Sequence, residues 1–402
     1  MKIIKGKYGE GIAFATTIEP KCEEQMVNLL SEEWAKDLKM RWMADCHYGK
    51  GCVVGTTMTI TDKIVPNLVG VDINCGMLVL KFHPFHFDFT EMDNAIRANI
   101  PLGKNNRKEV YYDFSSELEK LQCRKQINFE KVNLSIGSLG SGNHYCEWDR
   151  DDEGYLYLVI HTGSRNFGKL IAEYYQNQAI KYHSAKNGFV LNHIIQSLKT
   201  NGKTDQIESA IEKHKSNIPD DLAYLEGDLF DAYLNDMGIC QKMATKNREV
   251  IAEIICNVMN LPPPAEQFET CHNYIDLNSM ILRKGAIDAS KGVKSIIPIN
   301  MRDGALICIG KGNPDYNFSA SHGAGRPMSR TEATNTLTME KFRNDMMGIF
   351  STSISEDTLD ESPDAYKPMS EILENITDTV DVIKHIKPIY NIKAQEEKRK
   401  KK

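Results

Sequence analysis

The sequence predicts an α+β fold in which central mixed β-sheets are surrounded by helices. Segments rich in Val, Ile and Thr and interrupted by glycines predict strands along the chain. One long segment with helical spacing, Leu229–Met259, predicts a helix that buries an apolar stripe. The distinctive glycines and histidines are spread from residue 45 to residue 326, without an internal repeat or a proline-rich linker. We therefore expect a single domain, residues 1–402, with one site assembled from several loops.

The first elements are expected to be short strands and one helix. Gly11–Thr17 predicts a strand, and Glu23–Leu38 has the apolar spacing of a helix. Val53–Ile60 and Leu68–Phe82 are typical of strands joined by tight turns. Tyr155–Ile160 predicts a further strand that runs directly into a glycine turn.

The second half is expected to contain most of the helix. Lys169–His183 predicts a helix, and residues 183–262 are interpreted as a mainly helical insertion that the prolines from Pro262 bring to an end. Leu306–Ile309 predicts a short buried strand, and Ser370–Ile386 a final amphipathic helix. Residues 394–402 form a charged tail.

Bulk composition favours a protein of the cytoplasm. The formal net charge of −6 excludes a global basic field, so any nucleic-acid contact has to come from a local patch. The 10 cysteines are scattered, without a CxxC pair, which indicates a reducing compartment. No signal segment and no apolar run of membrane-spanning length is present, so we expect no membrane contact.

The run Ser321–Arg326, Ser-His-Gly-Ala-Gly-Arg, carries a candidate nucleophile. His322 is surrounded by small residues, so a large substrate can reach its ring. The backbone N–H groups that follow can bind an anion, and Arg326 and Arg330 add donors suited to phosphate. A histidine that accepts a phosphoryl or nucleotidyl group fits this setting. A glycine-rich turn with a packed histidine fits the run equally well.

A second group of residues has the chemistry of metal ligands. Each member alone is more often structural, but together they offer one carboxylate, one thiolate and three imidazoles. Five ligands exceed one tetrahedral site, so two metals that share Cys75 are a reasonable interpretation. The candidates are Asp72, Cys75, His144, His161 and His272.

Candidate phosphate-binding cations lie near these histidines. Arg165 follows His161 across a Gly-Ser turn, and Arg283 and Lys284 form a basic pair near the end of an expected strand. The chain has neither the GxxxxGK[ST] loop nor a GxGxxG run after a strand, so a nucleotide would be held in another way.

Seven runs in the chain resemble, in order, those of the RtcB family of RNA ligases. The resemblance extends along nearly the whole chain, and its runs are specific. They are Met43–Gly51, Gly70–Gly76, Gly140–Glu147, His161–Arg165, Cys271–Tyr274, Arg283–Ala286 and Ser321–Arg326.

The resemblance implies an enzyme that uses GTP and two Mn²⁺ ions to join an RNA 3′-phosphate or 2′,3′-cyclic phosphate end to a 5′-hydroxyl end, in RNA repair or tRNA splicing. It implies that His322 becomes guanylylated, and that Cys75 is shared between one metal held with Asp72 and His144 and another held with His161 and His272. It implies RNA-phosphate contacts at Arg165, Arg326 and Lys284. The implied nucleotide-binding residues are Asn143, His144, Glu147, His272, Asn273, Pro298, Met301, His322, Gly323, Ala324, Gly325, Tyr366 and Lys393.

Several points remain open at the level of sequence. Ligand softness alone favours zinc for a Cys/His set, whereas manganese rests on the resemblance. A protein that binds RNA ends without joining them, or a metal-dependent phosphoesterase, is an alternative on the same scaffold. The run Pro298–Ala305 departs from the family pattern near the expected nucleotide. The physiological RNA and any activating protein are not indicated.

Overall fold

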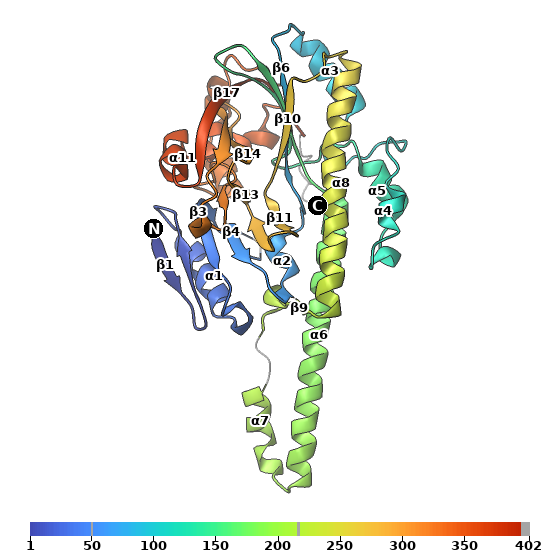
Figure 1. Ribbon diagram of the computed structural model, residues 1–402, viewed down its shortest axis with the longest axis vertical. Coiled ribbons are helices and arrows are strands. Elements are labelled where there is room, and N and C mark those ends of the chain that lie inside the picture. The colour runs from blue at the N-terminus through green and yellow to red at the C-terminus, as the bar shows by residue number, and fades with distance from the viewer. Residues whose placement is uncertain (50, 215–217, 395–402) are drawn as a thin grey trace.

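Two β-sheets form the centre of the protein, and helices surround them (Figure 1). The computed structural model describes residues 1–402 except 50, 215–217 and 395–402. The predicted α+β fold with mixed central sheets is confirmed. The charged tail, apart from Ala394, lies outside the described residues.

The first sheet has six strands in the order β1-β2-β3-β4-β12-β11. It is mixed, because β2 pairs with β3 in parallel and the other pairs are antiparallel. Its strands are β1 (Lys2–Lys5), β2 (Glu10–Ala13), β3 (Met40–His47), β4 (Val54–Thr59), β11 (Asn273–Asp276) and β12 (Ile281–Lys284).

The second sheet has seven antiparallel strands in the order β10-β6-β8-β7-β17-β15-β14. Its interior strand β8 is buried along its whole length, as expected for a run of Leu, Val and Ile. Its strands are β6 (Gly76–Phe82), β7 (Tyr145–Arg150), β8 (Leu156–Thr162), β10 (Glu266–Cys271), β14 (Lys294–Asn300), β15 (Gly304–Gly310) and β17 (Val380–Lys393).

Short strands and helices complete the fold. The strand pairs β5 (Lys63–Ile64) with β9 (Leu225–Glu226) and β13 (Ala286–Asp288) with β16 (Ser319–Ser321) form two small ribbons. The shorter α-helices are α1 (Pro20–Leu30), α2 (Pro66–Val69), α3 (Phe89–Asn99), α4 (Ser115–Leu118), α5 (Phe129–Ser135), α7 (Ile207–His214), α9 (Arg330–Thr336), α10 (Met339–Asp345) and α11 (Met369–Ile376).

Two long helices run beside each other next to the second sheet (Figure 1). α8 (Asp228–Val258) buries one face over most of its length, which confirms the prediction for Leu229–Met259. α6 (Arg165–Thr200) is buried only as far as His183, and its distal half projects with α7 as an arm away from the sheets. No helix of the described residues is long and apolar enough to cross a membrane.

Several predicted boundaries were wrong. The helix expected over Glu23–Leu38 begins earlier, with Pro20 in its first turn, and ends at Leu30. The expected strand Leu68–Phe82 begins with the end of α2 and becomes β6 only at Gly76. The expected helix Ser370–Ile386 is largely wrong, because α11 ends at Ile376 and the β-branched residues that follow pair in β17.

A metal-type cluster and a histidine cavity at the ends of the sheet strands

The candidate metal ligands gather at one end of four neighbouring strands of the second sheet. β6 begins there, β8 ends there, β7 begins there and β10 ends there, because adjacent strands are antiparallel. The register pairs Gly76 with both Cys271 and Thr162, and pairs His161 with Tyr145. Residues that are distant in sequence but flank these strand ends therefore become neighbours.

The structure brings the five predicted ligands into two groups that share Cys75. One group is Asp72, Cys75 and His144, and the other is Cys75, His161 and His272. Within each group the candidate ligand atoms lie within 4.8 Å of one another. Cys75 Sγ lies 3.4 Å from His144 Nε2 and 3.3 Å from His161 Nε2. The shared-thiolate arrangement expected from the sequence is thus geometrically available, and the role of these residues as ligands stays a prediction.

The electrostatics of the cluster suit a bound cation. Burial lowers the pKa of His161 and of His272, so both imidazoles are neutral and keep a lone pair for a metal. Burial raises the pKa of the Cys75 thiol, which a metal would have to deprotonate. Burial would also raise the pKa of Asp72, but His144 beside it holds the pKa of that carboxyl below its ordinary value.

The donor set also fits a transition metal by its chemistry. In His144 and His161 the ring atom that faces Cys75 is Nε2, while Nδ1 is buried on the other side of the ring without a partner among the described residues. Imidazole nitrogens beside a thiol and a carboxylate are ligands that transition metals take in proteins. The residues present therefore fit a metal.

His322 lies next to this cluster and is oriented by Asp45 of β3. Its Nδ1 lies 2.7 Å from Asp45 Oδ2, and the same oxygen accepts from the His322 backbone N–H at 3.1 Å. Burial would raise the pKa of Asp45, but the adjacent His322 holds it below its ordinary value, so Asp45 remains a carboxylate. This contact leaves Nε2 of His322 without a partner in the described part of the chain.

Four imidazoles form a row that leads from the first metal group to His322. The ring centroids of His144 and His161 are 5.5 Å apart, those of His161 and His272 are 5.2 Å apart, and those of His272 and His322 are 5.0 Å apart. The His322 ring is therefore the direct neighbour of the His272 ring, which belongs to the second metal group.

A cavity of about 340 Å³ lies over this row. Of the predicted nucleotide-binding residues, only His144 is absent from its lining. Gly325, with φ 70°, adopts a left-handed conformation, and a Cβ there would lie 2.9 Å from the Asp45 carbonyl oxygen. The glycine therefore lets the backbone pass close to Asp45 beside the candidate nucleophile.

Two buried carboxylates lie at the cavity or behind its wall: Glu147 lines it, and Glu361 contacts the lining residues Lys393 and Tyr366. Burial raises the pKa of Glu147 to about 7, and Asn391 donates to this carboxyl at 2.5 Å. Glu361 lies 2.5 Å from Lys393 Nζ, and Tyr366 donates to it at 2.7 Å. Burial would raise the pKa of Glu361, but Lys393 and the neighbouring arginines hold it at about 2.

The predicted phosphate-binding cations differ in their positions. Lys284 and Arg326 line the cavity. Arg165 does not line it, because its guanidinium donates to Ser138 and to the Gly103 carbonyl. Arg283 is 1% exposed and donates inside the protein, so its expected role in an RNA patch is wrong.

Sequence reasoning missed functional neighbours of the predicted residues. Asp45 lies in the run Met43–Gly51, which carried part of the resemblance, but a carboxylate 277 positions before His322 gives no sequence signal of contact. Glu361 lies in an acidic stretch with no motif. Arg248 lies inside the longest predicted helix, where an arginine normally indicates a solvated face.

The fold and the cluster define an α+β protein with five potential metal ligands and a histidine beside a cavity of about 340 Å³. A sequence model described as tRNA-splicing ligase RtcB matches residues 25–129 and 114–394. The chain therefore belongs to the RtcB family of ligases.

Named relatives cover most of the chain. It is 28% identical to the RNA-splicing ligase RtcB of Escherichia coli over 88% of this chain and 89% of that protein. It is 24% identical to the tRNA-splicing ligase RtcB of Methanococcus maripaludis, over 84% and 82% respectively. It is 27% identical to the RNA-splicing ligase RtcB of Mycobacterium bovis, over 83% and 91%.

Proposed function

We propose that this protein is a cytoplasmic RNA ligase that uses GTP to join a 3′-phosphate or 2′,3′-cyclic phosphate end to a 5′-hydroxyl end, in RNA repair or tRNA splicing. The observation that carries the proposal is the pair His322–Asp45. The carboxylate holds Nδ1 at 2.7 Å, which directs the lone pair of Nε2 outward. An imidazole whose Nδ1–H is held by a carboxylate presents Nε2 as its nucleophilic atom.

The first step is the attack of His322 Nε2 on the α-phosphorus of GTP. An N–P bond forms, the bond between the α-phosphorus and the bridging oxygen breaks, and pyrophosphate leaves. An oxygen of the RNA 3′-phosphate then attacks the same phosphorus, the N–P bond breaks, and the RNA end carries GMP through a pyrophosphate linkage. Finally the 5′-hydroxyl oxygen attacks the RNA phosphorus, loses its proton, and displaces GMP. A 2′,3′-cyclic phosphate is first opened by water to a 3′-phosphate.

The cavity supports binding of the guanylate. The backbone of Gly323–Gly325 follows the nucleophile and offers N–H groups to the α-phosphate. Glu147 and Lys393, which also line the cavity, offer an acceptor and a donor, as the edge of a guanine requires. Lys284 and Arg326 are the cations best placed for RNA phosphates.

Two metal ions held by the groups that share Cys75 would neutralise charge on the transferring phosphate. We propose Mn²⁺ as the active ion. The softness of the Cys/His set also favours Zn²⁺, which we expect to bind without supporting ligation.

The test is incubation of the protein with α-labelled GTP and Mn²⁺, followed by denaturing electrophoresis and mass spectrometry. We expect one guanylate, on His322. His322→Ala should bind metal, form no guanylate, and still join RNA that already carries a 3′-GMP. His83→Ala, at an exposed histidine outside the cavity, is the matched control and should behave as wild type.

The same experiment separates the alternative functions. A protein that only binds RNA ends gives neither guanylate nor joined product. A phosphoesterase removes the 3′-phosphate without GTP. A guanylate on another residue, or ligation without any guanylate, would overturn the assignment of His322.

A further inference from the structure

A buried arginine lies behind the metal-type cluster, outside the residues that line the cavity. Arg248 of α8 is 0% exposed. A guanidinium has five N–H donors, and each of them has an acceptor here. The acceptors are Glu269 Oε1 at 2.6 Å from Nε, the carbonyl oxygens of Asn74 and Thr162 at 2.8 and 2.6 Å from Nη1, and Thr245 Oγ1 and Cys271 Sγ at 3.4 and 3.5 Å from Nη2.

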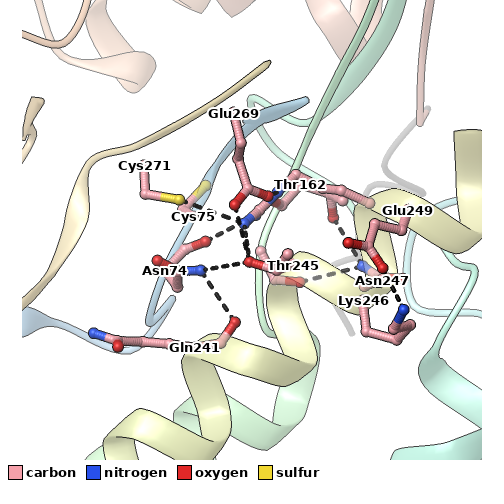
Figure 2. A network of polar contacts seen from close by, with 12 residues as sticks. Asn74, Cys75, Thr162, Gln241, Thr245, Lys246, Asn247, Glu249, Glu269 and Cys271 are labelled. Carbon is pink, nitrogen blue, oxygen red and sulfur yellow. Dashed lines mark hydrogen bonds and ion pairs between the residues drawn. The ribbon is translucent and has the colours of Figure 1, made fainter. Parts of the chain in front are cut away.

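Three of these acceptors belong to residues that adjoin candidate metal ligands. Each is the immediate chain neighbour of one member of the second metal group. The pairs are Asn74–Cys75, His161–Thr162 and Cys271–His272. Figure 2 shows Asn74, Thr162 and Cys271 converging from separate segments, with Cys75 beside Cys271.

We propose that Arg248 is a positioning residue for the metal group Cys75, His161 and His272. Its guanidinium is planar and rigid, so it fixes the spacing of three backbone segments to which the ligands are attached. These segments adjoin the start of β6, the end of β8 and the end of β10. Backbone bonds from the Asn74 N–H to the Asn273 carbonyl and from the His272 N–H to the Cys75 carbonyl already tie the first segment to the third. Arg248 adds side-chain bonds that tie both of them to the end of β8, at the point where the ligands need a fixed geometry.

Stability alone is a weak reason for a buried arginine at this position. The desolvation cost of a buried ion pair often equals or exceeds its Coulombic gain, and apolar residues of similar volume commonly replace such pairs without loss. The contacts of Arg248 instead match the requirement of a metal site, in which groups behind the ligands set ligand orientation and affinity.

The inference rests on metal binding in the proposed function, so the experiment begins with Mn²⁺ titration of the metal-free wild-type protein by calorimetry. Arg248→Met keeps the length of the side chain without its donors, and Arg248→Lys keeps the charge with fewer donors. We expect Mn²⁺ to bind about 10- to 100-fold more weakly at one site in both variants. The absorption bands of bound Co²⁺, which report ligand geometry, should change as well.

The matched control is Asp236→Asn on the same helix. Asp236 is also 0% exposed, and it accepts from the backbone of Gln122 and Cys123 and from Tyr175, away from the metal groups. It should lower the unfolding temperature and leave the Mn²⁺ isotherm and the Co²⁺ spectrum unchanged. If Arg248→Met does not fold, Arg248→Lys, which retains the buried charge, carries the test.

The outcomes separate the two proposals. A folded Arg248 variant that binds Mn²⁺ with wild-type affinity and an unaltered Co²⁺ spectrum would refute the positioning role. A control that weakens metal binding equally would also refute it, because general destabilisation would then explain the loss. A wild-type protein that binds no metal would count against the proposed function instead.

Discussion

Asp45→Asn is expected to slow the formation of the guanylate on His322 without preventing the later sealing step. The substitution keeps the size of the side chain and removes its charge. In the structure one carboxylate oxygen accepts both the His322 backbone N–H at 3.1 Å and Nδ1 at 2.7 Å. The neutral amide can still accept a hydrogen bond, but it no longer stabilises positive charge that develops on the ring as Nε2 attacks phosphorus.

The magnitude follows from the strength of that contact. A hydrogen bond to a charged group contributes about 1.5–3 kcal/mol. If this contribution is made mainly in the transition state, its loss slows guanylate formation about 10- to 150-fold, since 1.36 kcal/mol corresponds to a tenfold change in rate.

The assay is a single-turnover time course with labelled GTP, with covalent guanylate measured after rapid quenching. RNA that already carries a 3′-GMP should be joined at the wild-type rate, because it bypasses His322. Asp236→Asn controls for the loss of a buried carboxylate. An unchanged rate of guanylate formation in Asp45→Asn would refute the orienting role, and so would an equal loss in both steps.

Three further predictions concern metal, acid stability and RNA. Cys75→Ala should reduce Mn²⁺ binding at both sites, because both groups contain this thiol; calorimetry that finds one site unaffected would exclude sharing. Glu361→Gln should lower stability at neutral pH. The pKa of Glu361 is about 2 in the folded protein against an ordinary 4.5, so its contribution is present above pH 4.5 and disappears as the pH falls towards 2. That difference corresponds to at most about 3 kcal/mol, and thermal unfolding at several pH values should show wild type and variant converging in acid. Lys284→Ala should flatten the slope of log affinity for single-stranded RNA against log salt by about 0.7. Lys186→Ala, at a surface ion pair on α6, should leave that slope unchanged.

The gathering of the five candidate metal ligands was predictable from residue types, whereas the contacts of Arg248 behind them were not. Glycines and expected strand ends marked the positions of Asp72, Cys75 and the three histidines. Antiparallel pairing brings those strand ends together at the same end of the sheet. Arg248 gives no comparable signal, because helical periodicity describes which face is apolar and not which backbone groups an arginine will meet.

The main error in the fold has a similar cause. Ser370–Ile386 contains apolar residues at helical spacing, but the chain changes from helix to strand within it. Over the second part of this segment, helix and strand are close in local propensity. The pairing of β17 with β7 and β15 decides in favour of the strand. That pairing also brings Lys393 to the cavity, so part of the wrongly predicted helix and a predicted nucleotide-binding residue lie in the same strand.

The charges around the cavity bear on how this acidic protein would bind the polyanions of the proposed function. Counting cations in the sequence suggested a ready phosphate site, but Arg326, Arg330 and Lys393 all pair with Glu361. Their field at the cavity is therefore partly cancelled before any ligand arrives. A triphosphate or an RNA end gains from these cations only by competing with Glu361, whereas ions held by the Cys75 groups would add positive charge beside His322. Metal binding is accordingly expected to precede nucleotide binding, with Glu361 holding the three cationic side chains in ion pairs until then.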